Sequence, residues 1–148
     1  MSRAEMVILT NMCMIENDKG QILIQDRMKQ NWPGVTFPGG HIEKNESFHD
    51  AVVREVFEET GLTIRNPKLC GVKQFQTANE ERYIVFFYKA KEYEGELTSS
   101  AEGEVFWIEP DALKNYTLAN DFEEMYKVFS DEAISEFYYN EEWEIALM

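Results

Sequence analysis

Three glutamates near the middle of the chain have the spacing of a metal site. Glu55, Glu58 and Glu59 occupy positions i, i+3 and i+4 of a helix-forming segment, so their carboxylates can converge on one point. At about 100° per residue, two of them fall within the apolar stripe of that helix and the third lies beside it. The stripe is formed by Ala51, Val52 and Val56. Buried carboxylates that repel one another are stabilised by a divalent cation, and oxygen ligands suit Mg²⁺ or Mn²⁺.

The same helix allows a second interpretation, in which its charges form a solvated face. Arg54 fits either one, because it lies one turn before Glu58 and can hold a carboxylate in place. The preceding segment Phe37-Pro38-Gly39-Gly40 favours a ligand site, since two glycines let the backbone approach a bound group closely. A carbonyl of Gly39 or Gly40 could complete a metal shell beside the glutamates.

Together, these segments resemble the Nudix box, a 23-residue motif of hydrolases that cleave a nucleoside diphosphate linked to another group. Gly40, Glu46 and the run from Arg54 to Leu62 fill every fixed position of the motif. The resemblance implies a Nudix-type α/β/α sandwich of the α/β or α+β class, built on a central mixed sheet. It also implies a divalent metal cofactor, Mg²⁺ or alternatively Mn²⁺.

The resemblance assigns roles to individual residues. The implied metal ligands are Glu55, Glu58, Glu59 and the carbonyl of Gly39, and Arg54 belongs to the same catalytic group. In the family, the general base is a glutamate of the box or one from a later loop, so several candidates stay open. Glu102 and Glu104, which precede Trp107, are the candidates for the later carboxylate. A plain acidic loop is the alternative for these two.

The sequence beyond the box bears on the substrate. Family members that act on ADP-ribose resemble one another in a proline that follows the box, and this chain has Thr77 there. The tyrosine of dinucleoside polyphosphate hydrolases and the marker segment of NADH-cleaving members are missing as well. What remains resembles the MutT-like group, which hydrolyses oxidised purine nucleoside triphosphates such as 8-oxo-dGTP to a monophosphate and pyrophosphate.

The segment Leu118-Ala119-Asn120-Asp121 resembles the MutT segment whose asparagine contacts the base. An amide donates and accepts at once, so Asn120 could bind both the O6 acceptor and the N7–H donor of 8-oxoguanine. Unmodified guanine would leave one buried group unpaired. The alternative is helix capping, because Asn120 or Asp121, each followed three residues later by a glutamate, matches a capping box.

Two further side chains are candidates for substrate contact. Arg27 ends a predicted strand and could bind the nucleotide or its phosphates, with a plain surface arginine as the alternative. Phe37 is the first candidate for the wall of a base pocket, although most aromatic residues belong to the core. The other aromatic candidates are Trp32, Trp107, Tyr116 and Phe122.

The remaining segments predict interleaved strands and helices around a mixed sheet. Strands are predicted at Glu5–Ile15, Gln21–Arg27, Lys68–Gln76, Arg82–Lys89 and Glu104–Ile108. A turn at Asn17–Gly20 joins the first two, and the next two form a hairpin. Helices are predicted at Glu46–Thr60 and Asn120–Phe129, with a helical turn at Pro110–Leu113 and a further helix considered at Asp131–Tyr139. Asn31–Gly40 is predicted to be a loop.

The length, net charge and cysteine content of the chain restrict these hypotheses further. A chain of 148 residues favours one domain, residues 1–148, and its net charge of -14 makes bulk nucleic-acid binding unfavourable. The two cysteines are expected to be free, buried thiols, and without a targeting or membrane-spanning segment the protein is expected to be cytoplasmic. The acidic, aromatic tail from Asp131 to Met148 could pack on the domain or on a second subunit, so a homodimer is left open.

The sequence therefore predicts a Mg²⁺-dependent nucleoside triphosphate pyrophosphohydrolase that acts on oxidised purine nucleotides. A Nudix hydrolase of another nucleotide or of an RNA 5′ end is the first alternative. A Nudix-like binding module without turnover is the second, and it is disfavoured because such modules usually lose box carboxylates.

Overall fold

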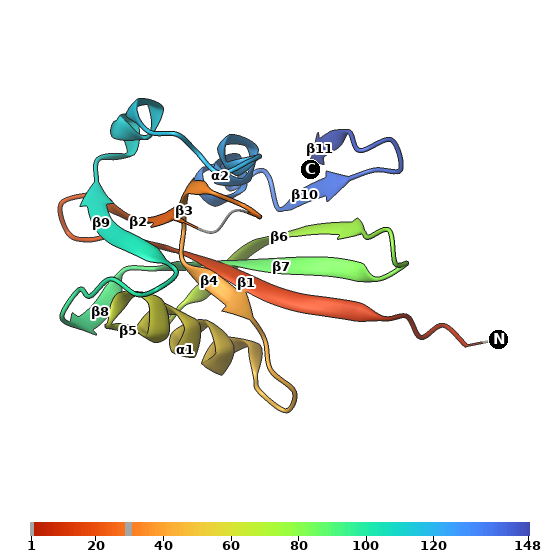
Figure 1. Cartoon of the computed structure of the whole chain (residues 1–148), viewed down its shortest axis with the longest axis horizontal. Helices are drawn as coiled ribbons and strands as arrows, with labels where there is room; N and C mark the ends of the chain where they lie inside the picture. Colours follow the sequence, from red (N-terminus) through yellow and green to blue (C-terminus); the bar gives the residue numbers. More distant parts are fainter. Residues whose placement is uncertain (1, 29–30) are drawn as a thin grey trace.

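The computed structural model describes residues 2–28 and 31–148, and its main sheet carries helices on both faces (Figure 1). The sheet has the strand order β11-β10-β6-β7-β1-β4. Its strands are β1 (Val7–Ile15), β4 (Gly39–His41), β6 (Lys68–Gln76), β7 (Arg82–Ala90), β10 (Glu136–Tyr139) and β11 (Ile145–Leu147). β1 is parallel to β7 and β10 is parallel to β6, whereas β6 and β7 form an antiparallel hairpin. The central sheet is therefore mixed, as predicted.

Two smaller sheets and the helices complete the fold. One sheet has the order β3 (Gly34–Thr36), β2 (Ile22–Arg27) and β9 (Gly103–Ile108), and the other pairs β5 (Leu62–Arg65) with β8 (Glu92–Gly95). The helices are α1 (Phe48–Thr60), α2 (Phe122–Ser130) and a 3₁₀ helix at Pro110–Asn115. Within the described residues, no helix is long and apolar enough to cross a membrane.

The core is divided between the two faces of the main sheet because successive strand residues point to opposite sides. On one face, Met12 and Met14 of β1 belong to the same cluster as Phe122 and Phe129 of α2. The opposite face has a second cluster, in which Cys13 and Ile15 of β1 lie with Val52 and Val56 of α1. This division confirms the α/β/α sandwich, with α1 and α2 on opposite sides of the sheet (Figure 1).

Two predictions of local structure were wrong. The segment Asp131–Tyr139 does not form a helix, because its second half is strand β10, which extends the sheet by pairing with β6. The predicted loop Asn31–Gly40 contains the short strands β3 and β4. The turn at Asn17–Gly20 is present, but β1 and β2 diverge after one bridge, between Glu16 and Ile22, and join different sheets.

Candidate active site

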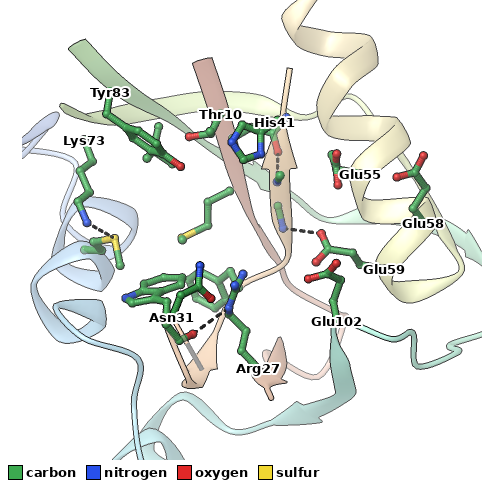
Figure 2. A pocket seen from close by; sticks show the side chains of 18 of the residues that line it. Thr10, Arg27, Asn31, His41, Glu55, Glu58, Glu59, Lys73, Tyr83 and Glu102 are labelled. Carbon is green, nitrogen blue, oxygen red and sulfur yellow. Dashed lines mark hydrogen bonds between the residues drawn. The ribbon is translucent and has the colours of Figure 1, made fainter. Parts of the chain in front are cut away.

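A cavity of about 730 Å³ opens beside β1 and β4 (Figure 2). This volume lies in the range of pockets that bind small molecules. Acidic side chains line one side of the cavity, and Lys73 of β6 and Tyr83 of β7 line the opposite side (Figure 2). The acidic side includes Glu55, Glu58 and Glu59 of α1 and Glu102 of the loop before β9. The structure therefore brings the predicted acidic residues, apart from Glu104, to one site.

Local sequence fixes both ends of the helix that carries these glutamates. The hydroxyl of Ser47 accepts a hydrogen bond from the backbone N–H of Asp50 at 2.9 Å, which caps the first turn. Gly61 ends the helix in the left-handed conformation, at φ 79°, and donates its N–H to the carbonyl of Phe57. A Cβ on Gly61 would lie 2.4 Å from the carbonyl oxygen of Glu96, so both conformation and space require glycine here.

The apolar stripe of α1 fixes its rotation relative to the sheet. Ala51, Val52 and Val56 are fully buried, and Glu59 lies on the same buried face with 4 % of its surface exposed. Glu58 lies at the edge of that face, and 54 % of its side chain is exposed. Packing of the apolar residues therefore points Glu59 into the cavity and leaves Glu58 at its mouth.

Glu59 is a buried acid whose two oxygens are both occupied. Its Oε1 accepts a hydrogen bond from Nε2 of Gln25, and its Oε2 accepts one from the N–H of Gly39, each at 2.9 Å. Burial raises the pKa of Glu59 to about 7, against the opposing effect of the Gln25 hydrogen bond. Among the described residues, no Lys or Arg pairs with Glu59. Its ionised form would therefore be stabilised by a bound cation.

Arg54 organises the acids at the surface of α1, and its main partner is Glu46. Its Nε and Nη2 donate to the two oxygens of Glu46 at 2.7 and 2.9 Å, a bidentate pair that lowers the pKa of Glu46 to about 2. Its Nη1 reaches Glu55 at 2.9 Å and Glu58 at 3.3 Å. Nη2 also donates to the carbonyl of His41, so Arg54 ties the helix to the end of β4.

The glycines of β4 allow the backbone to lie against these carboxylates. A Cβ on Gly40 would lie 2.3 Å from the carboxylate of Glu55, and one on Gly39 would lie 2.0 Å from the carbonyl oxygen of Asn11. Glu55 is largely shielded from solvent, and burial raises its pKa while the hydrogen bond from Arg54 opposes the shift. Both predicted glycines therefore border the acidic side of the cavity, as expected from their lack of side chains.

The two candidates for a later carboxylate separate in the structure. Glu102 lies in the loop before β9 and lines the cavity, and its charge contributes to the raised pKa of Glu59. Glu104 lies within β9, opposite Asp26 of β2, and is exposed outside the cavity lining. The placement of Glu104 at the site was therefore wrong, because the strand directs its side chain away.

Two of the predicted substrate contacts lie on the cavity wall. Arg27 lines the cavity and donates its Nε to the carbonyl of Trp32 at 2.9 Å, with its guanidinium 5.3 Å from the centre of the Trp32 ring. Phe37 also lines the cavity, but it is 1 % exposed and packs edge-to-face on Phe122 and Phe129. Phe37 is thus mainly a core residue that forms the floor of the site.

The side chain of Asn120 neither lines the main cavity, where it could contact a base, nor caps helix α2. Its side chain is exposed, donates to the carboxylate of Asp121 at 3.3 Å and is not among the side chains that line the main cavity. Only its backbone carbonyl reaches toward that cavity, by accepting a hydrogen bond from Trp32. Asp121 occupies the N-cap position of α2, but its carboxylate accepts from the hydroxyl of Tyr139 and makes no capping hydrogen bond within the described structure.

Three residues of the site were missed by sequence reasoning. Gln25, which donates to Glu59, is buried directly after the apolar run Ile22-Leu23-Ile24, and a polar residue at such a position in a strand is a signal that could have been read. Lys73 and Tyr83 carry no such signal, because they reach the cavity only through the pairing of β6 with β7.

The acidic residues fit a divalent cation by their chemistry and burial. They offer only oxygen donors, and Glu59 is buried without a basic partner among the described residues. In the arrangement described for residues 2–28 and 31–148, no three acidic, histidine or cysteine side chains meet at one point. The physical reason is that Arg54 holds Glu55 and Glu58, whereas Gln25 and Gly39 hold Glu59. A cation would therefore compete with Arg54 for Glu55 and Glu58.

Comparisons with known proteins agree with this architecture. The chain is 32 % identical over 112 residues to an uncharacterised Nudix hydrolase of Bacillus subtilis, covering 72 % of this chain and 69 % of that protein. It is 34 % identical over 103 residues to an 8-oxo-dGTP diphosphatase of Haemophilus influenzae, covering 68 % and 74 %. A crystal structure of a MutT protein from Bacillus halodurans superposes with a TM-score of 0.74 at 28 % identity, covering 94 % of each chain.

The family assignment rests on a match that spans most of the chain. The model of the NUDIX domain matches residues 8–130, which includes the box, the glutamate helix and Glu102. The same range covers the strands whose residues line the cavity, whereas β10 and β11 lie beyond its end. With its sequence motif, its fold and its acidic site in agreement, the chain belongs to the Nudix family and is a MutT-like hydrolase of phosphoric anhydrides.

Proposed function

We propose that this protein hydrolyses oxidised guanine nucleoside triphosphates, 8-oxo-dGTP foremost, to the monophosphate and pyrophosphate, with Mg²⁺ as cofactor and Mn²⁺ as a substitute. The observation that carries the proposal is the cavity of about 730 Å³ with acids on one side and aromatic side chains on the other. The 34 % identity to an 8-oxo-dGTP diphosphatase supports the choice of substrate. The substrate belongs to the nucleotide pool, so the cytoplasm is the expected site of action.

The proposed cation ligands are four of the acids that line the cavity together with one backbone carbonyl. They are Glu55, Glu58, Glu59, Glu102 and the carbonyl of Gly39. A divalent cation bound there supplies positive charge that offsets the charge of the phosphates. Local positive charge is needed because the chain carries a net charge of -14, which repels a polyphosphate at longer range.

The protein's own residues orient the reaction. Arg54 holds Glu55 and Glu58 in place through the contacts described above, and Arg27 on another wall binds the phosphates or sugar. A glutamate of the site accepts a proton from the attacking water, whose oxygen forms a new bond to phosphorus. The anhydride P–O bond breaks at the same phosphorus, and the products leave as nucleoside monophosphate and pyrophosphate.

The direct test is a turnover assay with Mg²⁺ over 8-oxo-dGTP, dGTP, ADP-ribose and a dinucleoside polyphosphate, with pyrophosphate and phosphate measured separately. Pyrophosphate release with a clear preference for 8-oxo-dGTP is expected. A preference for another nucleotide would reject the proposed substrate and retain the hydrolase. Binding of nucleotide with no hydrolysis of any substrate would favour a binding module instead.

A variant of the exposed acid separates catalysis from folding. Glu58→Gln should abolish most of the turnover and leave the melting temperature nearly unchanged, because 54 % of this side chain is exposed. Glu123→Gln is the matched control, since this exposed glutamate lies on α2 outside the main cavity. Full activity in Glu58→Gln would exclude Glu58 from the catalytic group.

A further inference from the structure

Lys73 of β6 lies at the side of the cavity opposite the glutamates (Figure 2). Three aromatic rings surround its ammonium group, whose Nζ lies 4.9 Å from the ring centre of Phe137, 5.6 Å from Tyr139 and 5.7 Å from Phe75. Burial lowers the pKa of Lys73, and the charge of Asp121 opposes that shift. The ammonium group of Lys73 is therefore partly dehydrated, and it faces the cavity from among these three aromatic rings.

The hydrogen-bonding capacity of this ammonium is mostly unused. An ammonium has three N–H donors, and the structure gives Nζ one contact, to Sδ of Met125 at 3.7 Å, which is a weak acceptor. In the described part of the chain, no carboxylate forms an ion pair with it. Because Lys73 lines the cavity, a ligand with an acceptor atom at this position would supply the missing partner.

The position of Lys73 along the cavity indicates which part of a nucleotide it would meet. If the phosphates lie at the glutamates, as the proposed function requires, the base extends toward β6 and β7. There, Phe75 and Tyr83 stack on each other with ring centres 5.2 Å apart and 14° between their planes. Met125 and Val85 add apolar surface to the same wall. Aromatic and apolar surface with a single cation suits a flat heterocycle that has an acceptor on its edge.

We propose that Lys73 is a specificity-determining residue that selects bases with a carbonyl oxygen on the edge facing it. Guanine, 8-oxoguanine and thymine present such an acceptor, whereas adenine and cytosine place an amino donor at the corresponding position. Lysine can only donate, so an amino group would meet it without forming a hydrogen bond. The inference rests on the proposed function for the direction in which the nucleotide lies.

A structural role for Lys73 makes a different prediction. Lys73 and Phe137 are paired neighbours in the ladder between β6 and β10, so their contact could serve only to hold the C-terminal hairpin. In that case, replacing Lys73 would lower the melting temperature and change the activity toward all nucleotides alike. Selection of the base, in contrast, would change the ratio of activities between nucleotides.

The experiment measures kcat/KM of the full chain with dGTP, 8-oxo-dGTP, dTTP, dATP and dCTP for the wild type and Lys73→Met, which keeps the length of the side chain. We expect the wild type to prefer the carbonyl-bearing bases about tenfold or more, and Lys73→Met to lose that preference. Lys73→Arg should retain it. Lys68→Met is the control, because Lys68 is exposed on the same strand and outside the cavity.

Equilibrium binding separates this inference from the proposed function. Calorimetric titration with dGMP, dTMP, dAMP and dCMP measures base preference without turnover. If no triphosphate is hydrolysed but dGMP and dTMP bind in preference through Lys73, the proposed function fails and the role of Lys73 stands. An equal effect of Lys73→Met on all bases, or no binding of any nucleotide, would overturn the role of Lys73.

Discussion

At the scale of single residues, the raised pKa of Glu59 makes the free energy of unfolding depend on pH. A carboxyl group with a raised pKa holds its proton more tightly in the folded chain than in the unfolded chain, so protonation favours folding. For Glu59, this contribution is complete below the unfolded value of 4.5 and is lost as the pH rises to about 7. The shift corresponds to a loss of about 3 kcal/mol in the free energy of unfolding across this window.

We therefore predict that Glu59→Gln weakens the pH dependence of stability in metal-free protein. The free energy of unfolding, measured in urea with a chelator, should fall between pH 4.5 and 7 less steeply in the variant than in the wild type. In the variant, the new glutamine amide can place its NH₂ group against the N–H of Gly39 or of Gln25, which lowers the free energy of unfolding. This loss is the same at every pH, so it does not change the slope. Parallel curves for the two proteins would show that Glu59 titrates normally.

Gly39 and Gly40 should respond differently to the same added methyl group. In Gly40→Ala, the methyl meets the movable carboxylate of Glu55, so turnover should fall about 100-fold with little change in stability. In Gly39→Ala, it meets the backbone carbonyl of Asn11, which cannot turn aside, and the loss of stability should reach about 2 kcal/mol. Turnover and urea unfolding of both variants check this contrast, and equal stability of the two would contradict it.

At the scale of elements, the glutamate helix was predictable and the C-terminal hairpin was not. The stop at Gly61 and the apolar stripe of α1 are local features, so the sequence located the helix to within two residues. Strand β10 depends on pairing with β6, more than 60 residues earlier in the chain, and no local pattern reports such a contact. For the same reason, the positions of Glu104 and Asn120 could not be derived from spacing alone.

The hairpin leads to a prediction about stability. Phe137 of β10 is fully buried, and Phe137→Ala should lower the free energy of unfolding by about 3–5 kcal/mol. Trp143 belongs to the turn of the same hairpin and is 58 % exposed, so Trp143→Ala should change it by less than about 1 kcal/mol. Urea unfolding of both variants tests this difference. Similar values would indicate that the hairpin detaches from the domain in solution.

At the scale of the whole molecule, the net charge of -14 makes divalent cations stabilising in two ways. Any cation screens the repulsion between distributed surface acids, and a bound one stabilises the folded chain through its site. If the cation is present at about ten times its dissociation constant, binding adds about 1.4 kcal/mol. We expect Mg²⁺ to raise the melting temperature more than NaCl at equal ionic strength. This excess should disappear in the double variant Glu55→Gln, Glu59→Gln; an unchanged excess would place the binding elsewhere.

The aromatic surround of Lys73 is assembled from two separate parts of the polypeptide. Lys73 and Phe75 belong to the stretch that the family model matches, whereas Phe137 and Tyr139 lie after its end at residue 130. The acids that serve hydrolysis all precede that point. A change in the terminal hairpin would therefore alter the rings around Lys73 and leave the acids on the other side of the cavity in place. Chimeras in which the segment after residue 130 is replaced would then separate the tuning of base preference from the hydrolytic chemistry.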